Sequence, residues 1–215
     1  MTYLEIVNKI LRRLREREVS SVSQTAYSKL IGDFVNDAKT EVEDAWQWSA
    51  LRTTLTLTTS ANVFNYQLGG SQNNFNILDV VNDTSNRFME YKPSTWFNNV
   101  FLNLNPAEGS PYYYNFNGVA SNGDTQVDLY PVPDGVYELR FNCVLRPTDL
   151  VNDTDSLIIP NQPVFLLATA KAIEERGEDG GTSSINAYMA GKAALADAIA
   201  YDSSRHPEET IWYTI

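Results

Sequence analysis

The periodicity of apolar residues changes from helical to alternating near residue 48, and this change constrains the fold more than any other feature. Apolar residues recur at helical spacing from Tyr27 to Trp46, which predicts a helix of about 22 residues whose packing face Trp46 completes. After Trp48, apolar residues such as Leu55 and Leu57 alternate with threonines, which predicts a strand. The stretch "AWQWSALRTTLTLT" is therefore predicted to join a helical layer to a sheet.

The two tryptophans of this stretch could serve as a platform for a sugar ring, as a wedge in a core, or as an anchor for a partner chain. We interpret Trp46 and Trp48 as a helix-sheet joint, because Trp46 falls on the helical stripe. Trp48 would then wedge helices against sheet, either inside one subunit or against a neighbouring copy.

The first helix carries a basic outer face. Thr2 with Glu5 makes a capping box, and the apolar spacing that follows predicts a helix over about residues 3–17. One interpretation of this face is a solvated surface; the other is a docking face, centred on Arg12 and Arg13, for an acidic partner or a neighbouring subunit. The basic residues are Lys9, Arg12, Arg13, Arg15 and Arg17.

The middle of the chain is typical of antiparallel β-structure. Residues 69–157 alternate short apolar runs with Gly, Asn, Pro and Asp. The segment from Ser94 is predicted to form either a short helix or a loop. The tyrosines of "PYYYNF" could stack on sugars, but at strand spacing they are more typical of a covered sheet face.

Helical character returns near the C-terminus, where one helix is predicted to end at Gly177 and an alanine-rich helix to follow. The predicted fold is therefore α+β: N- and C-terminal helix pairs forming a helical bundle, residues 1–49 and 158–204, with a central antiparallel β-rich insert, residues 50–157.

The last residues, 205–215, are predicted to form an extended arm that ends in "TIWYTI". Alternating apolar residues after a polar break can add a strand to the sheet edge of another chain. Docking on another chain and packing on the same subunit remain equally open. The apolar arm residues are Ile211, Trp212, Tyr213 and Ile215.

Composition argues against catalysis and against nonspecific binding to nucleic acid. The chain has 27 acidic and 16 basic residues, a formal charge of −11, and phosphate binding needs clustered cations. The one histidine, His206, falls in a polar linker, and Cys143 alternates with apolar residues as a buried side chain does. "DLVNDTDS" lacks the glycine and final acid of a calcium loop and is interpreted as an Asx-rich turn. We therefore expect no catalytic residue, cofactor or metal.

The chain also lacks an apolar run long enough for a signal peptide or a membrane span. We expect a soluble protein, assembled in the reducing cytoplasm of the host cell, with no membrane partner.

The order of four segments resembles the head-to-tail adaptor proteins of short-tailed phages, the tail tubular A and related connector families. These segments are "WQW" leading into "LTLTTSANVFNYQL", the strand-turn-strand "LYPVPDGVYEL", the Asp-rich run ending in "IP", and the alanine-rich helix pair at the end. Together they span about residues 24–200.

The resemblance implies a structural virion protein at the head-tail junction, not an enzyme. It implies a homo-oligomeric ring, commonly twelve-fold, between the portal protein and the tail nozzle protein, with double-stranded DNA passing through the lumen without specific binding. The alternative hypothesis is a carbohydrate-binding or glycan-hydrolysing tail component that uses exposed aromatic residues.

Overall fold

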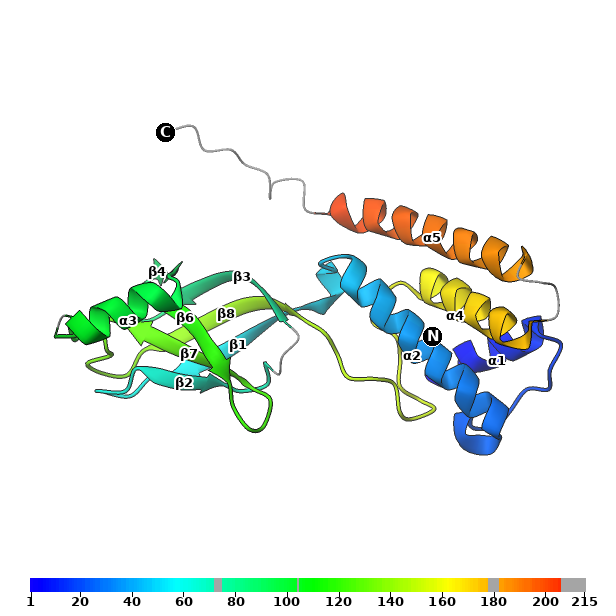
Figure 1. Ribbon diagram of the computed structural model, residues 1–215, viewed down its shortest axis with the longest axis horizontal. Helices are drawn as coiled ribbons and strands as arrows, with labels where there is room; N and C mark the ends of the chain where they lie inside the picture. The colour runs from blue at the N-terminus through cyan, green and yellow to red at the C-terminus, as the bar shows by residue number, and fades with distance from the viewer. Residues whose placement is uncertain (72–74, 104, 178–181, 206–215) are drawn as a thin grey trace. The chain divides into compact units, whose positions relative to one another are not determined.

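The chain forms two compact units. The computed structural model describes residues 1–215 except 72–74, 104, 178–181 and 206–215. The first unit combines Met1–Leu51 with the segment that begins at Pro147, and the second is the single stretch Arg52–Arg146. The first contains helices α1, α2, α4 and α5, and the second contains the strands and α3 (Figure 1). We call them the helical unit and the β unit.

The helical unit is organised around α4, the helix Asn161–Arg176. This helix contacts α1 (Tyr3–Arg13), α2 (Ala26–Ala45) and α5 (Thr182–Ser203). Its side chains from Pro163 to Ala170 are all buried, as expected of a helix that is covered on several sides. In Figure 1, α5 runs alongside α4.

The helix ends follow local capping chemistry. The capping box of Thr2 and Glu5 is confirmed at the start of α1. The helix ends at Arg13, earlier than predicted, because the chain turns sharply there and Arg15 adopts a positive φ of 61°. Ser21 caps only a short 3-10 helix, η1 (Val22–Gln24), whereas Thr25 and Ser28 form the capping box of α2.

The β unit consists of two four-stranded sheets, in the orders β1-β8-β3-β4 and β2-β7-β6-β5. Buried side chains from both sheets, among them Leu57, Leu68, Val127 and Phe141, form one core. The strands are β1 (Arg52–Thr58), β2 (Asn65–Leu68), β3 (Phe75–Asn82), β4 (Arg87–Phe88), β5 (Glu90–Tyr91), β6 (Tyr113–Val119), β7 (Thr125–Tyr130) and β8 (Glu138–Leu145).

The predicted strand after Trp48 is present as β1, which follows a second 3-10 helix, η2 (Ser49–Leu51). Leu57 is buried, whereas Thr54, Thr56 and Thr58 are exposed. β1 pairs antiparallel with β8, with Arg52 opposite Val144. The first and last strands of the β unit are therefore neighbours.

The α+β class is confirmed, and in the middle of the chain the structure resolves one open alternative and corrects one prediction. Ser94–Asn103 forms a helix, α3, which settles the alternative left open by the sequence. The predicted insert is also not purely antiparallel, because β5 pairs with β6 in parallel.

The segment 147–157 lies in the helical unit, although its composition had assigned it to the β-rich insert. The backbone amide of Tyr3 donates to the carbonyl of Asp155 at 2.7 Å, and Leu157 donates to the carbonyl of Met1 at 3.1 Å. Because its backbone pairs with the start of α1, this turn-rich segment needs no sheet partner.

Candidate functional site

Trp46 was predicted to complete the packing face of the helix, but in the structure Trp48 is the buried tryptophan and Trp46 is partly exposed. Trp48 is 1% exposed and its indole Nε1 donates to the carbonyl of Val42 at 2.7 Å, whereas Trp46 is 37% exposed. The reason is that α2 ends at Ala45 and Trp46 is an extended C-cap residue with φ −155° and ψ 155°. The helical stripe therefore stops before Trp46, and Trp48 packs inside its own subunit.

Trp46 instead takes part in a polar cluster around Asp202, near the end of α5. Its indole Nε1 donates to Asp202 Oδ2 at 3.1 Å, and the Ser49 backbone amide donates to the same oxygen at 3.0 Å. Burial alone would raise the pKa of Asp202, but the hydrogen bonds from Ser49 and Trp46 hold it below its ordinary value. The carboxylate thus ties the end of α5 to the segment that leaves α2.

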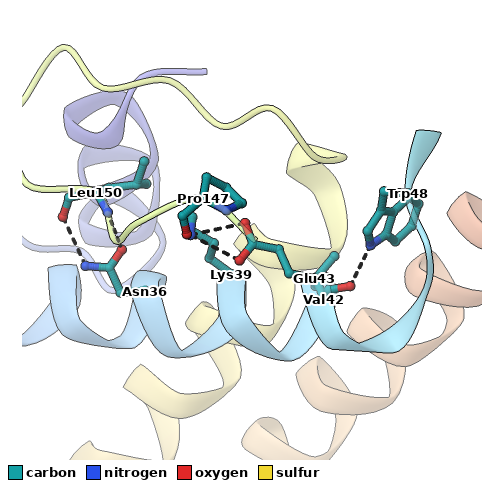
Figure 2. A network of polar contacts seen from close by, with 7 residues as sticks. All are labelled: Asn36, Lys39, Val42, Glu43, Trp48, Pro147 and Leu150. Atoms are coloured by element: carbon teal, nitrogen blue, oxygen red, sulfur yellow. Dashed lines mark hydrogen bonds and ion pairs between the residues drawn. The ribbon is translucent and has the colours of Figure 1, made fainter. Parts of the chain in front are cut away.

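One face of α2 holds the chain where it returns from the β unit (Figure 2). Asn36 donates to the Leu150 carbonyl at 3.1 Å and accepts from the Leu150 amide at 3.0 Å. Lys39 Nζ donates to the carbonyl of Pro147 at 3.1 Å and pairs with Glu43 at 3.1 Å. We call Asn36, Lys39 and Glu43 the α2 anchor.

The Lys39–Glu43 pair is almost completely enclosed, with side chains only 3% and 1% exposed. An isolated charge in a protein interior is costly, so each member depends on the other. Trp48 binds the next turn of the same helix through Val42. α2 therefore holds both connections to the β unit, the outgoing chain at Trp48 and the returning chain at Pro147.

The basic face of α1 is only partly used within the subunit. Lys9 Nζ and the Arg13 guanidinium lie 4.0 and 4.9 Å from the centre of the Phe165 ring. Arg12 pairs with Glu18 at 2.7 Å, but both side chains are more than half exposed, and exposed pairs contribute little. Arg12 and Arg13 thus lie at the surface where a partner can reach them.

A pocket that the sequence did not predict opens elsewhere on the helical unit. It has a volume of about 530 Å³ and is lined by residues that include Tyr3, Lys29, Asp33, Asn36 and Asp153. Sequence reasoning missed it because its walls come from four separate segments: α1, the turn around η1, the first half of α2, and the loop before α4. Alternation and helical spacing carry no signal for such a meeting.

The loop before α4 is confirmed as an Asx-rich turn. Asp155 Oδ2 accepts from the backbone amides of Asn152 and Val151, both at 2.8 Å. These hydrogen bonds hold the pKa of Asp155 below its ordinary value. The carboxylate is occupied by its own loop, as the turn interpretation requires.

The aromatic residues of the β unit mostly contact one another. Trp96 on α3 lies edge-on to Tyr113 and Tyr130, with ring centres 5.0 and 5.5 Å away. Tyr114, the next residue of β6, is buried in the core shared by the two sheets. The tyrosine run therefore covers a sheet face, as predicted, while Phe88 and Tyr91 remain more than half exposed on the short strands β4 and β5.

The residues considered for catalysis or metal binding are Cys143, His206 and the acidic side chains. Cys143 is fully buried, and burial raises the pKa of its thiol. Over the residues that the structure describes, no three His, Cys, Asp or Glu side chains are placed to hold a metal ion. His206 and the arm residues Ile211, Trp212, Tyr213 and Ile215 lie outside the described residues.

In the described parts of the chain, no helix combines the length and apolar character that crossing a bilayer requires. The features with defined geometry are the α2 anchor, the charged face of α1 and an open pocket on the helical unit. Features of this kind are typical of proteins that act through contacts of their surfaces.

Comparison with known families agrees with this class. A family model described as SU10 adaptor protein matches residues 1–210, so the chain belongs to the SU10 adaptor protein family. No curated protein matches the chain. The family confirms the predicted phage adaptor class, a structural protein of the virion at the head-tail junction that interacts with portal and tail.

Proposed function

We propose that this chain is the subunit of a ring that joins the portal of the phage head to the tail nozzle and surrounds the passage for the genome. The observation that carries the proposal is the family match over residues 1–210, which takes in both compact units. The resemblance to adaptors of short-tailed phages supplies the twelve-fold copy number and the two neighbours.

The charge of the chain supports a lumen through which DNA slides. At −11 per subunit, a ring of copies gathers a large negative charge around one channel, and acidic walls repel phosphate. DNA would therefore pass without specific binding.

Within this ring we assign the helical unit to the portal side and the β unit to the nozzle side. In this proposal the predicted helical bundle, residues 1–49 and 158–204, contacts the portal. The β-rich insert, residues 50–157, contacts the nozzle. The arm, residues 205–215, contacts another chain. This assignment rests on the resemblance.

The proposal is tested by mixing the purified chain with purified portal protein of the same phage and measuring mass by native mass spectrometry and sedimentation velocity. We expect a ring-sized complex on the portal. A chain that remains monomeric with portal, and instead binds glycans on an array, would favour the carbohydrate-binding alternative.

The arm is tested by removing residues 208–215. If Ile211, Trp212, Tyr213 and Ile215 dock on another chain, the truncated protein keeps its thermal unfolding midpoint but needs a higher concentration to assemble on the portal. Deleting His206 to Glu209 and retaining "TIWYTI" is the matched control, because it shortens the link and keeps the apolar residues. A large drop in the unfolding midpoint on truncation would show that the arm packs on its own subunit.

A further inference from the structure

Strand β1 forms an open edge of the first sheet. Over the residues that the structure describes, it pairs with β8 on one side and with no strand on the other. With seven residues it is longer than the other strands that end a sheet, β2, β4 and β5. An edge strand of this kind presents a row of unpaired backbone donors and acceptors, to which another chain can bind.

The register of β1 identifies the backbone groups that point outward. The amide of Thr59, directly after β1, donates to the carbonyl of Tyr137 at 2.9 Å, so the odd-numbered residues of β1 direct their backbone bonds to β8. The amides and carbonyls of Thr54, Thr56 and Thr58 therefore point away from the sheet. All three residues are exposed, so this side of the strand is accessible to a partner.

The edge also lacks the features with which proteins commonly prevent pairing to another chain. β1 contains neither proline nor lysine, and its register with β8 continues without a bulge. On the apolar side of the strand, Leu55 packs against the core of the β unit but is only half-buried. A strand added beside β1 would cover this side chain and bond to the outward backbone groups.

The chain itself contains a segment that suits this edge. Residues 210–215, "TIWYTI", place Ile211, Tyr213 and Ile215 on one side of an extended chain and two threonines on the other. In an added strand, the three apolar side chains would lie beside Leu55, and the threonines beside those of β1. Main-chain hydrogen bonds would supply the affinity and this alternation the specificity.

We propose that, in the assembled ring, residues 210–215 of one copy add a strand to the outward edge of β1 in a second copy. The inference rests on the proposed ring and names the acceptor of the arm. Residues 206–209, "HPEE", provide a polar link of about 13 Å when extended, which reaches a subunit in direct contact. Arm and edge are different surfaces of one chain, so the contact is heterologous, the type of contact that closes a ring of identical subunits.

The edge is tested by a proline at an outward position. Thr56→Pro removes an amide that points away from β8, so the ladder between β1 and β8 keeps its hydrogen bonds. The variant is expected to raise the concentration for half-assembly on the portal about tenfold, because the added strand loses a main-chain hydrogen bond and its continuous pairing. Assembly is measured by sedimentation velocity and native mass spectrometry with purified portal.

Thr56→Val is the matched control. It also replaces the threonine side chain but keeps the backbone amide, so this variant should assemble as the wild type does. Circular dichroism confirms that each variant is folded. If Thr56→Pro unfolds, Thr54→Pro replaces it, because the amide of Thr54 also points outward, and it should weaken assembly in the same direction.

Removal of residues 208–215 identifies the occupant of the edge. This truncation and Thr56→Pro remove the same contact from its two sides, so a chain with both changes should assemble no worse than a chain with either one. An equal mixture of the truncated chain and Thr56→Pro should assemble better than either protein alone. In the mixture, the arm of the proline variant meets the intact edge of a truncated neighbour.

The outcomes separate this inference from the proposed function. If the wild type forms rings and Thr56→Pro matches Thr56→Val, the edge contact is wrong although the ring stands. If Thr56→Pro and the truncation weaken assembly by factors that multiply, edge and arm bind different partners and the inference is overturned. If their effects do not multiply but the mixture shows no gain, the arm binds its own subunit and the second copy is the wrong occupant. If the wild type does not assemble with portal, the ring itself is wrong.

Discussion

Trp46 and Trp48 stand two residues apart, yet they should differ widely in their contribution to stability. Trp48→Ala removes a side chain that is 1% exposed and also leaves the Val42 carbonyl without its donor, so we expect a loss of about 3–5 kcal/mol. Trp46→Ala removes a side chain that is 37% exposed and one hydrogen bond to Asp202, which should cost about 1 kcal/mol. Urea unfolding monitored by circular dichroism measures both, and equal losses would contradict the assignment.

The sequence alone had favoured Trp46 as the buried residue because the helical stripe can be extended to it. Helical spacing shows where a face continues only as long as the helix itself continues, and the spacing does not reveal that the backbone becomes extended at Trp46. Trp48 has no periodic signal at all, since it lies between a helix and a strand. Its burial depends on a carbonyl six residues earlier, which only the folded chain brings into reach.

Asp128 of β7 is the second residue for which the structure predicts a change in stability. It is 6% exposed; burial raises its pKa, and the hydrogen bond from Asn65 at 2.6 Å opposes this only in part. For an acid with a raised folded pKa, the contribution to stability is present below the unfolded value near 3.8 and is lost as pH rises through the folded value.

Asp128→Asn should therefore raise the urea midpoint of the β unit at pH 7, because no charge has to be buried. At pH 3, where Asp128 of the wild type is protonated, the gain should largely vanish. Unfolding at the two pH values is the measurement, and a variant that is less stable at both would show that the charged form is the one the fold prefers.

At the scale of elements, the α2 anchor can be tested through its buried ion pair. Lys39→Met leaves the carboxylate of Glu43 in the interior without its ammonium partner and removes the donor to Pro147. We expect a loss of about 3–5 kcal/mol.

The double variant Lys39→Met, Glu43→Leu is the matched control, because it removes both charges and keeps apolar volume. It should be clearly more stable than Lys39→Met alone. Chemical denaturation of the three proteins checks this order, and a double variant as unstable as the single one would show that the bond to Pro147, rather than the charge balance, holds the returning chain.

Elements with strong local signals were predictable, and those that depend on distant partners were not. The strand β1 followed from the alternation of leucine and threonine, and the start of α1 followed from the capping box of Thr2. The segment 147–157 reads as turns by composition, but its position depends on Asn36, Lys39 and the first residues of the chain. The pocket lined by Tyr3 and Asp33 was hidden for the same reason.

At the scale of the whole molecule, the β unit should fold by itself. It is one uninterrupted stretch, Arg52–Arg146, with a core drawn from both of its sheets. We expect a fragment of residues 52–146 to unfold in a single cooperative thermal transition. Calorimetry and far-ultraviolet circular dichroism, which reports the loss of β-structure, measure this transition. A fragment without such a transition would mean that the strands depend on the helical unit.

The pairing of β1 with β8 has a consequence for how adaptors of this kind can diversify. Because Arg52 lies opposite Val144, the two ends of the inserted unit are held one strand spacing apart, about 5 Å, whatever lies between them. Loops between the other strands can lengthen, shorten or be exchanged without altering the gap that the helical unit has to bridge. The β unit thus behaves as an interchangeable module, in which a new surface can evolve while the helical unit, which contains the α2 anchor, keeps its geometry.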